Sequence, residues 1–131
     1  MKEVYEFLKE NHTFYLATVD GDEPQVRPFG VVAIIEGKLY IQTANTKKVY
    51  QQMIKNPKIA ICTVGKEGRW LRISATVVED DRLEIRQQFL DANPILKDMY
   101  AADDGKCTVF YLKDATCTFY SFTSDPEVHK F

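Results

Sequence analysis

Residues 14–35 read FYLATVDGDEPQVRPFGVVAII, and this stretch decides the fold that we expect for the chain. Residues 14–19 are rich in aromatic and β-branched side chains, residues 20–24 are turn formers, and residues 25–35 return to a strand-like pattern. Two such segments separated by a short turn are typical of an antiparallel hairpin. The hairpin therefore predicts a protein built from antiparallel strands.

Strand and helix patterns continue beyond this hairpin. Further strands are expected at residues 39–43, 59–64, 70–78, 107–112 and 116–122, with turns at 36–38, 65–68 and 113–115. Helices are expected at residues 2–10, 46–55 and 80–100, the last interrupted at Asn93-Pro94. Short strands in hairpins with a few helices favour an α+β, mainly β, fold. We expect a six- to seven-stranded antiparallel barrel, closed or nearly closed, with two or three peripheral helices.

Length and charge exclude several classes of protein. The chain has 131 residues, with 17 Lys or Arg against 19 Asp or Glu and a net charge of −2, which suits a single domain over residues 1–131. A general nucleic-acid binder carries a basic excess, so no nucleic-acid partner is expected. No apolar run approaches the ~18 residues of a membrane span, and residues 1–6 lack a signal-peptide core. We therefore expect a cytoplasmic protein without a membrane partner.

Cysteine and histidine show no metal-binding or disulfide pattern. Cys62, Cys107 and Cys117 make an odd number without a CxxC pair, which favours three buried free thiols. His12 and His129 lie near opposite ends of the sequence, and no metal site is expected. GxSxG, HExxH and P-loop motifs are absent, so no catalytic residue is predicted.

Residues 43–48, TANTKK, lie where an expected strand meets an expected helix. Asn45 or Thr46 is a suitable helix N-cap. The positive end of a helix dipole prefers acidic residues, yet Lys47 and Lys48 lie there. Backbone N–H groups, lysines and threonine hydroxyls at this place would bind a phosphate. The alternative is a solvated lysine pair on a surface helix.

Residues 26–30, VRPFG, place a proline within a strand. Such a proline indicates an edge, a bulge or a place where strand pairing is broken. Neighbouring backbone groups are then free to meet a planar ligand, with Arg27 as the anchor for an anion or a carbonyl. The alternative is an irregular edge strand whose arginine faces water.

Residues 70–78, WLRISATVV, alternate between the two faces of a strand. The apolar positions expected to face the barrel core are Leu71, Ile73, Ala75 and Val77. Trp70 and Arg72 then point outward. Because an exposed tryptophan is costly, we expect a partner subunit or a ligand to cover Trp70, or alternatively a peripheral helix of its own chain.

In order and spacing, these segments resemble the pyridoxamine 5′-phosphate oxidase-like superfamily, the FMN-binding split barrels. The resemblance rests on the hairpin of residues 16–28, on residues 39–43, on Thr46-Lys47-Lys48 shortly before Asn56-Pro57, and on residues 69–74. It is closest to the short NimA/NimC-like (nitroimidazole-resistance) members. The resemblance implies one FMN-binding domain with a split β-barrel fold.

The resemblance also implies a homodimer with FMN at the subunit interface. The residues that it places along the flavin ring and ribityl chain are Arg27, Pro28, Phe29, Gln42 and Thr43. Those that it places at the phosphate are Thr46, Lys47 and Lys48.

Two residues of the strand matching 69–74, Trp70 and Arg72, complete the implied cofactor-binding set. The vitamin-forming oxidases of the family have a flavin-binding glutamine at the position of Trp70. The tryptophan of this chain is expected either to stack near the ring or to seal the dimer. The Arg-rich C-terminal segment by which they recognise pyridoxal phosphate is not visible in residues 116–131. True pyridoxamine phosphate oxidase activity is therefore not expected.

The function implied is that of an FMN-dependent oxidoreductase. It would pass electrons from reduced FMN to a small organic acceptor such as a nitroaromatic or a quinone. The alternative is a non-catalytic module that binds FMN or another anionic ligand as a sensor, carrier or store. A third hypothesis, an OB-like nucleic-acid barrel, predicts salt-sensitive oligonucleotide binding.

Overall fold

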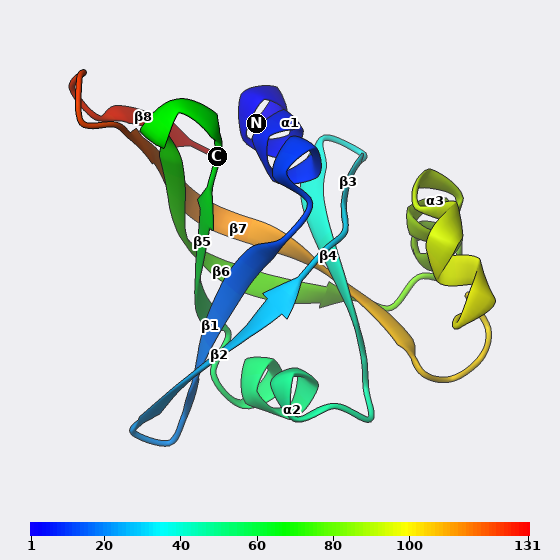
Figure 1. The fold of residues 1–131 in the computed structure, drawn as a ribbon. Helices are drawn as coiled ribbons and strands as arrows, with labels where there is room; N and C mark the ends of the chain where they lie inside the picture. Colours follow the sequence, from blue (N-terminus) through cyan, green and yellow to red (C-terminus); the bar gives the residue numbers. More distant parts are fainter.

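The computed structural model describes all of residues 1–131, and it contains eight strands in one antiparallel sheet together with three α-helices (Figure 1). The strands are β1 (Phe14–Asp20), β2 (Glu23–Phe29), β3 (Val32–Ile35), β4 (Lys38–Ala44), β5 (Lys58–Val64), β6 (Trp70–Asp80), β7 (Cys107–Tyr120) and β8 (Glu127–Lys130). The helices are α1 (Lys2–Asn11), α2 (Lys48–Lys55) and α3 (Leu83–Ala92), with 3₁₀ turns η1 (Lys66–Gly68) and η2 (Pro94–Asp98). The α+β, mainly β, class is confirmed, with eight strands where six or seven were expected.

The curled sheet is a split barrel whose two end strands, β2 and β3, are consecutive in the chain. The strand order is β2-β1-β5-β6-β7-β4-β3, with β8 paired to β7, and the sheet is not closed. A single strand over residues 25–35 is therefore a wrong prediction, because β2 ends at Phe29 and β3 begins at Val32. Pro28 has no N–H to extend a ladder, and the chain crosses at Gly30 to the opposite end of the sheet.

Two tight turns fix the register of the N-terminal strands. β1 and β2 pair along their whole length, with Asp20 opposite Glu23 at the turn, which confirms the predicted hairpin. Between β3 and β4, Glu36 and Gly37 have positive φ values of 51° and 72°, as a type I′ hairpin turn requires.

β7 is one long strand, so the predicted turn at residues 113–115 is wrong. Asp114 has a φ of 52°, and the register of β7 against β6 shifts between Ser74 and Thr76. Aspartate tolerates this left-handed conformation, and the resulting β-bulge bends the strand without reversing it. The bent strand pairs with β4 through its first half and with β8 through its second.

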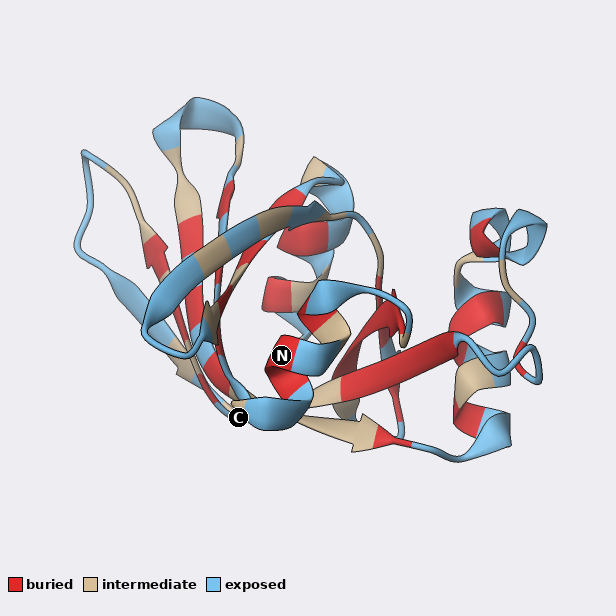
Figure 2. Ribbon diagram, turned by 90° about the horizontal axis from the view of Figure 1, so that it is seen from below, coloured by how far each residue is buried: buried red, intermediate tan, exposed pale blue.

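The main core lies inside the curl of the sheet, with apolar side chains of α1 and α2 packed against it. Buried and exposed positions alternate along β5 and the first part of β6, as strands buried on one face require. β4 is instead buried along almost its whole length, and Figure 2 shows both alternating and continuously buried strands. The four positions of β6 that were predicted to face inward are at most 7% exposed: Leu71, Ile73, Ala75 and Val77. Their burial confirms the predicted orientation of β6.

A second, smaller core lies between α3 and β3, β4 and β7, at the side of the barrel where α3 stands in Figure 1. Its largest members are Tyr40, Phe89 and Leu90, each at most 1% exposed. The helix predicted over residues 80–100 is shorter than expected, because Asn93-Pro94 ends α3 and the chain continues as η2. Residue 80 ends β6 instead of beginning the helix.

The three cysteines are free, but only two of them are buried. Cys107 and Cys117 are buried, and burial raises the pKa of the Cys117 thiol to about 11. Cys62 is exposed, contrary to the expectation of three buried thiols. The alternation of β5 explains the difference, because Ile61 and Thr63 face inward and turn Cys62 outward.

The two ends of the chain lie close together (Figures 1 and 2). The backbone of Phe131 exchanges two hydrogen bonds with Ala115 of β7, at 2.7 and 3.1 Å. Helix α1 buries Val4 and Leu8 in the main core. No helix has both the length and the apolar character that crossing a membrane requires.

Candidate functional site

A pocket of about 280 Å³ opens between β2, β4, the start of α2 and the segment that follows α3. Its lining residues are Arg27, Pro28, Phe29, Gly30, Val31, Gln42, Thr43, Lys47, Val49, Leu96, Met99 and Tyr100. Six of the ten residues proposed from the sequence are thus brought together. Apolar walls with a few polar groups are typical of sites for organic ligands.

β2 contributes the irregular wall of this pocket. The strand lies at one end of the sheet order, so its outer edge is unpaired, as Pro28 predicted. Phe29 packs against the core through Phe14, with ring centroids 5.9 Å apart. The end of β2 is therefore anchored, and it presents Arg27 and Pro28 to the pocket.

Arg27 is held by neutral partners only. Its Nη1 donates to the Leu16 carbonyl oxygen at 3.2 Å and to Thr18 Oγ1 at 2.7 Å, and its Nη2 donates to Gln52 Oε1 at 2.7 Å. The hydroxyl of Thr18 donates to the same Gln52 oxygen. Desolvation lowers the pKa of Arg27 from its ordinary value. The guanidinium is fixed in place, yet no carboxylate compensates its charge.

β4 presents polar atoms that have no partner in the protein. Gln42 Nε2 donates to the Thr43 carbonyl oxygen at 3.2 Å, which leaves Gln42 Oε1 as a free acceptor. The Thr43 hydroxyl also makes no hydrogen bond, whereas the Thr43 carbonyl accepts a second one from Thr108. No unpartnered side-chain polar atom of the chain is sealed from solvent, so neither free atom is fully buried, and both residues line the pocket.

Helix α2 is not capped by Asn45 or Thr46, although the sequence predicted one of them as its N-cap. Lys47 is the N-cap, with extended φ and ψ of −92° and 151°, and no side chain caps the helix. Asn45 instead donates to the Gly105 carbonyl oxygen, because pairing of β4 with β7 brings that loop alongside. Thr46 is exposed. The uncapped helix start therefore faces the pocket through Lys47 and Val49.

Lys47 and Lys48 line different pockets. Lys48 lines a hollow of about 570 Å³ between α2 and the β1–β2 turn. The other residues of this hollow are Val19, Asp20, Gly21, Gln51, Gln52, Lys55 and Asn56, of which only Val19 is apolar. Because it lacks apolar walls, this larger hollow is the weaker candidate for an organic ligand.

Trp70 and Arg72 lie outside the candidate pocket of this chain. Arg72 is exposed on β6. The indole of Trp70 stacks on Tyr120 at a centroid distance of 5.4 Å and contacts Phe122 at 5.2 Å. Its cover within the chain is thus Tyr120, the last residue of β7, together with Phe122 just beyond the strand, and not the peripheral helix that was the alternative.

The sequence did not indicate the wall formed by Leu96, Met99 and Tyr100. The break at Asn93-Pro94 was visible, but nothing in the sequence shows that the next turn folds over the far end of β4. Met99 is 70% exposed, so its apolar side chain at the pocket is accessible to a ligand or a partner. With Arg27 and Lys47 as cations and these residues as an apolar wall, the pocket can bind an anion that is joined to a flat apolar group.

Comparison with known proteins identifies relatives of the whole chain. A sequence model described as pyridoxamine 5′-phosphate oxidase matches residues 1–116. The crystal structure of a NimC/NimA family protein from Clostridium acetobutylicum is 48% identical, with a TM-score of 0.98 over 100% of this chain and 92% of that one. No match was found among curated proteins.

More distant structures share the fold alone. General Stress Protein 26 from Bacillus anthracis is 19% identical, with a TM-score of 0.77 over 99% of this chain and 98% of that one. An FAD-binding protein from Mesorhizobium loti is 17% identical, with a TM-score of 0.64 over 92% and 94% of the two chains. The family model over residues 1–116 and the 48% identity over the whole chain show that the chain belongs to the pyridoxamine 5′-phosphate oxidase family, and within it to the NimC/NimA-like proteins.

Proposed function

We propose that this protein is an FMN-binding flavoprotein that passes electrons to a small organic acceptor such as a nitroaromatic or a quinone. One observation carries the proposal. The candidate pocket places two cations that have no ion-pair partner, Arg27 and Lys47, beside an apolar wall and a free amide oxygen.

The two cations that line the pocket suit a phosphate. A phosphate monoester carries about −1.5 to −2 charges at neutral pH, which two cations compensate. Lys47 supplies a mobile ammonium at the helix start, and Arg27 retains an Nε–H and one Nη2–H that its protein partners do not use. Thr46, which is exposed next to Lys47, is the outer part of the proposed phosphate site, whereas Lys48 lines the separate polar hollow.

The remainder of the pocket suits a flavin ring. Pro28, Phe29 and Tyr100 give flat or rigid apolar surfaces, and Gln42 Oε1 can accept a hydrogen bond from a ring N–H. The residues present therefore fit FMN. The FAD-binding protein from Mesorhizobium loti, which shares this fold, supports flavin binding.

Bound flavin supplies the electron transfer, and the residues of the chain bind and orient it. No histidine, cysteine or carboxylate lines the pocket, so Lys47 and Tyr100 are its only side chains of the kinds that commonly act as a general acid or base. This observation also supports the second candidate function, a non-catalytic module that holds FMN or another anionic ligand.

We further propose that the complete site is formed by a homodimer. A volume of about 280 Å³ falls below the roughly 300–1,000 Å³ usual for sites that enclose an organic ligand. A second copy would close the pocket and could bring its own outward-facing β6, with Trp70 and Arg72, to the ring. Size-exclusion chromatography with light scattering measures whether a dimer forms.

The direct test is to purify the protein and record its visible spectrum. Flavin absorption, or uptake of FMN on titration of a colourless sample, supports the proposal, and a colourless protein that binds no FMN contradicts it. Anaerobic reduction with NAD(P)H or dithionite, followed by a nitroimidazole, then separates the two functions. Reoxidation coupled to loss of the nitro group indicates an enzyme, whereas inert reduced flavin indicates a binding module.

A further inference from the structure

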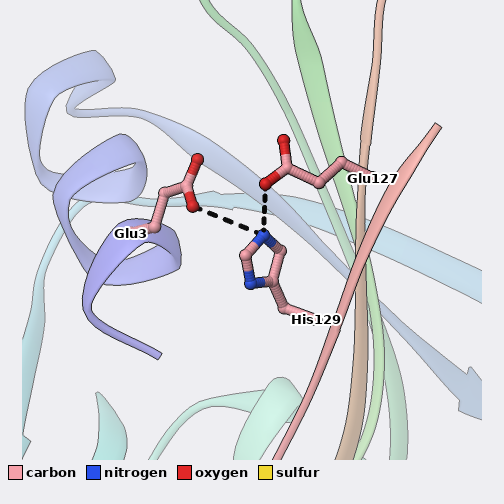
Figure 3. A group of neighbouring side chains, drawn as sticks. All are labelled: Glu3, Glu127 and His129. Atoms are coloured by element: carbon pink, nitrogen blue, oxygen red, sulfur yellow. Dashed lines mark hydrogen bonds and ion pairs between the residues drawn. The ribbon is translucent and has the colours of Figure 1, made fainter. Parts of the chain in front are cut away.

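Three potential metal ligands from the two ends of the chain meet at one point on the surface. Glu3 lies in the first turn of α1, and Glu127 and His129 lie on β8. Figure 3 shows the imidazole between the two carboxylates. His129 Nε2 is 3.4 Å from Glu3 Oε2 and 3.0 Å from Glu127 Oε1, and the three ligand atoms lie within 4.8 Å of one another.

These distances suit a shared cation. Ligand atoms on one tetrahedral zinc ion, at about 2.0–2.2 Å from it, are roughly 3.3–3.6 Å apart. Of the two distances from the imidazole nitrogen, 3.4 Å lies in this range and 3.0 Å is slightly shorter, so a small rotation of the exposed glutamate side chains is sufficient to bring all three atoms onto one ion. The side chains of Glu3 and Glu127 are 46% and 55% exposed, which leaves a route for the ion and room for water as a fourth ligand.

Arg69 contacts the carboxylates of Glu3 and Glu127 on the side away from His129 and so orients them. Its Nη2 lies 3.1 Å from Glu3 Oε1 and 3.6 Å from Glu127 Oε2, which are the oxygens that do not face His129. The guanidinium is itself held over the ring of Phe119, at 4.1 Å from the centroid. In metal sites, hydrogen-bond partners commonly fix the atoms of the ligand side chains that do not bind the ion themselves. With a neutral imidazole the cluster has a net charge of −1, so it still attracts a cation.

We propose that Glu3, Glu127 and His129 form a binding site for a divalent transition-metal ion of the zinc type. One imidazole nitrogen and two carboxylate oxygens are ligands that zinc accepts, whereas magnesium and calcium prefer oxygen alone. The ion ties the N-terminal helix to the C-terminal strand. The match to the family model ends at residue 116, so Glu127 and His129 lie beyond it.

The test measures the melting temperature and the heat of binding of the full-length chain. The protein carries Cys62→Ser throughout, because this exposed thiol is a competing zinc ligand. After treatment with a chelator and its removal, zinc at about ten times its Kd should raise Tm by roughly 5 °C, with one ion bound per chain. Magnesium and calcium at the same concentration should leave Tm unchanged.

Matched variants locate the effect. Glu127→Gln and His129→Gln should each abolish the zinc-dependent rise in Tm and weaken binding at least tenfold. Glu10→Gln on the same helix and His12→Gln, the other histidine, should retain both. All of these side chains are at least partly exposed, and the metal-free Tm of each variant verifies that it folds. An unchanged or lowered Tm in zinc, or an equal rise in His129→Gln, overturns the proposal.

Discussion

Arg27 and Arg82 are both held by networks of hydrogen bonds, and the two networks differ in the charge of the partners. Arg27, on β2, donates to a carbonyl oxygen, a threonine hydroxyl and a glutamine amide oxygen, all of them neutral. Arg82, just before α3, donates to Asp80 at 2.9–3.0 Å and to Glu36 at 3.0 Å. Both guanidinium groups are positioned, but only that of Arg82 has its charge compensated.

The pKa values of the two guanidinium groups shift in opposite directions. Desolvation lowers the pKa of Arg27, whereas the Asp80 and Glu36 carboxylates raise the pKa of Arg82. Asp80 also accepts a hydrogen bond from Tyr40 at 2.7 Å, which connects this network to the second core. A fixed cation without a counter-ion at a pocket wall is available to bind an anionic ligand. A cation that is already paired with carboxylates instead stabilises the fold.

The largest expected effect is on ligand affinity at Arg27. Arg27→Ala should weaken FMN binding by about 30–100-fold, roughly 2–3 kcal/mol, because a charge-assisted contact is lost. Arg82→Ala should bind FMN within about twofold of wild type, since its charge is used inside the protein. Titration followed by quenching of flavin fluorescence measures both. Equal affinities in the two variants would contradict the functional contrast between the arginines.

The second effect is on stability at Asp80, whose side chain is 8% exposed. Asp80→Asn should lower the free energy of unfolding by about 1–3 kcal/mol, because Arg82 loses its charged acceptor. Tyr40→Phe, which removes one neutral donor from the same carboxylate, should cost about 1 kcal/mol. Urea unfolding monitored by circular dichroism gives both values. A normal unfolding midpoint for Asp80→Asn would mean that the compensated network does not stabilise the fold.

The third effect separates the two neighbouring lysines. Lys47→Ala should weaken FMN binding by about tenfold, roughly 1.4 kcal/mol, because Lys47 lines the candidate pocket. Lys48→Ala should change it by less than about twofold, because Lys48 lines the polar hollow. Each variant removes one ammonium from the same helix start, so each controls for the other. The reverse order of effects would place the phosphate in the larger hollow.

The smallest effect concerns acid stability. Hydrogen bonds from Arg82 hold the pKa of Asp80 well below its usual range. A depressed folded-state pKa stabilises the fold above the unfolded-state value of about 3.9, and this contribution is lost as the pH falls toward the folded-state pKa. Below about pH 4, the gap in unfolding free energy between wild type and Asp80→Asn should therefore narrow. A gap that stays constant from neutral pH down to about pH 2 would show that the carboxylate does not titrate as described.

Much of the fold could be predicted because it depends on local patterns. The alternation from Leu71 to Val77 identified the inward face of β6, and the turn residues after Val19 identified the first hairpin. Two predictions failed where local signals are ambiguous. Asp114 marks a bulge and not a turn, and Gly30 marks a crossing between the two ends of the sheet. Both residue types serve in turns and in irregular strands alike.

The candidate site was predictable only in part. The types and spacing of Arg27, Gln42 and Lys47 indicated an anionic ligand next to two strands and a helix start. The wall at Met99 lies more than fifty residues further along the chain and has no local signal. For the terminal cluster, the two-residue spacing of Glu127 and His129 on a strand places both side chains on one face, a signal that could have been found.

The sequence by itself determined most of the strands and helices, which face of β6 is buried and which residues can bind an anion, because these follow from side-chain size, periodicity and charge. Only the tertiary structure decided which cations are compensated, which pocket each of two adjacent lysines enters, and that Glu3 meets His129. Those relations depend on contacts between segments far apart in the chain, which the packing of the sheet and helices creates.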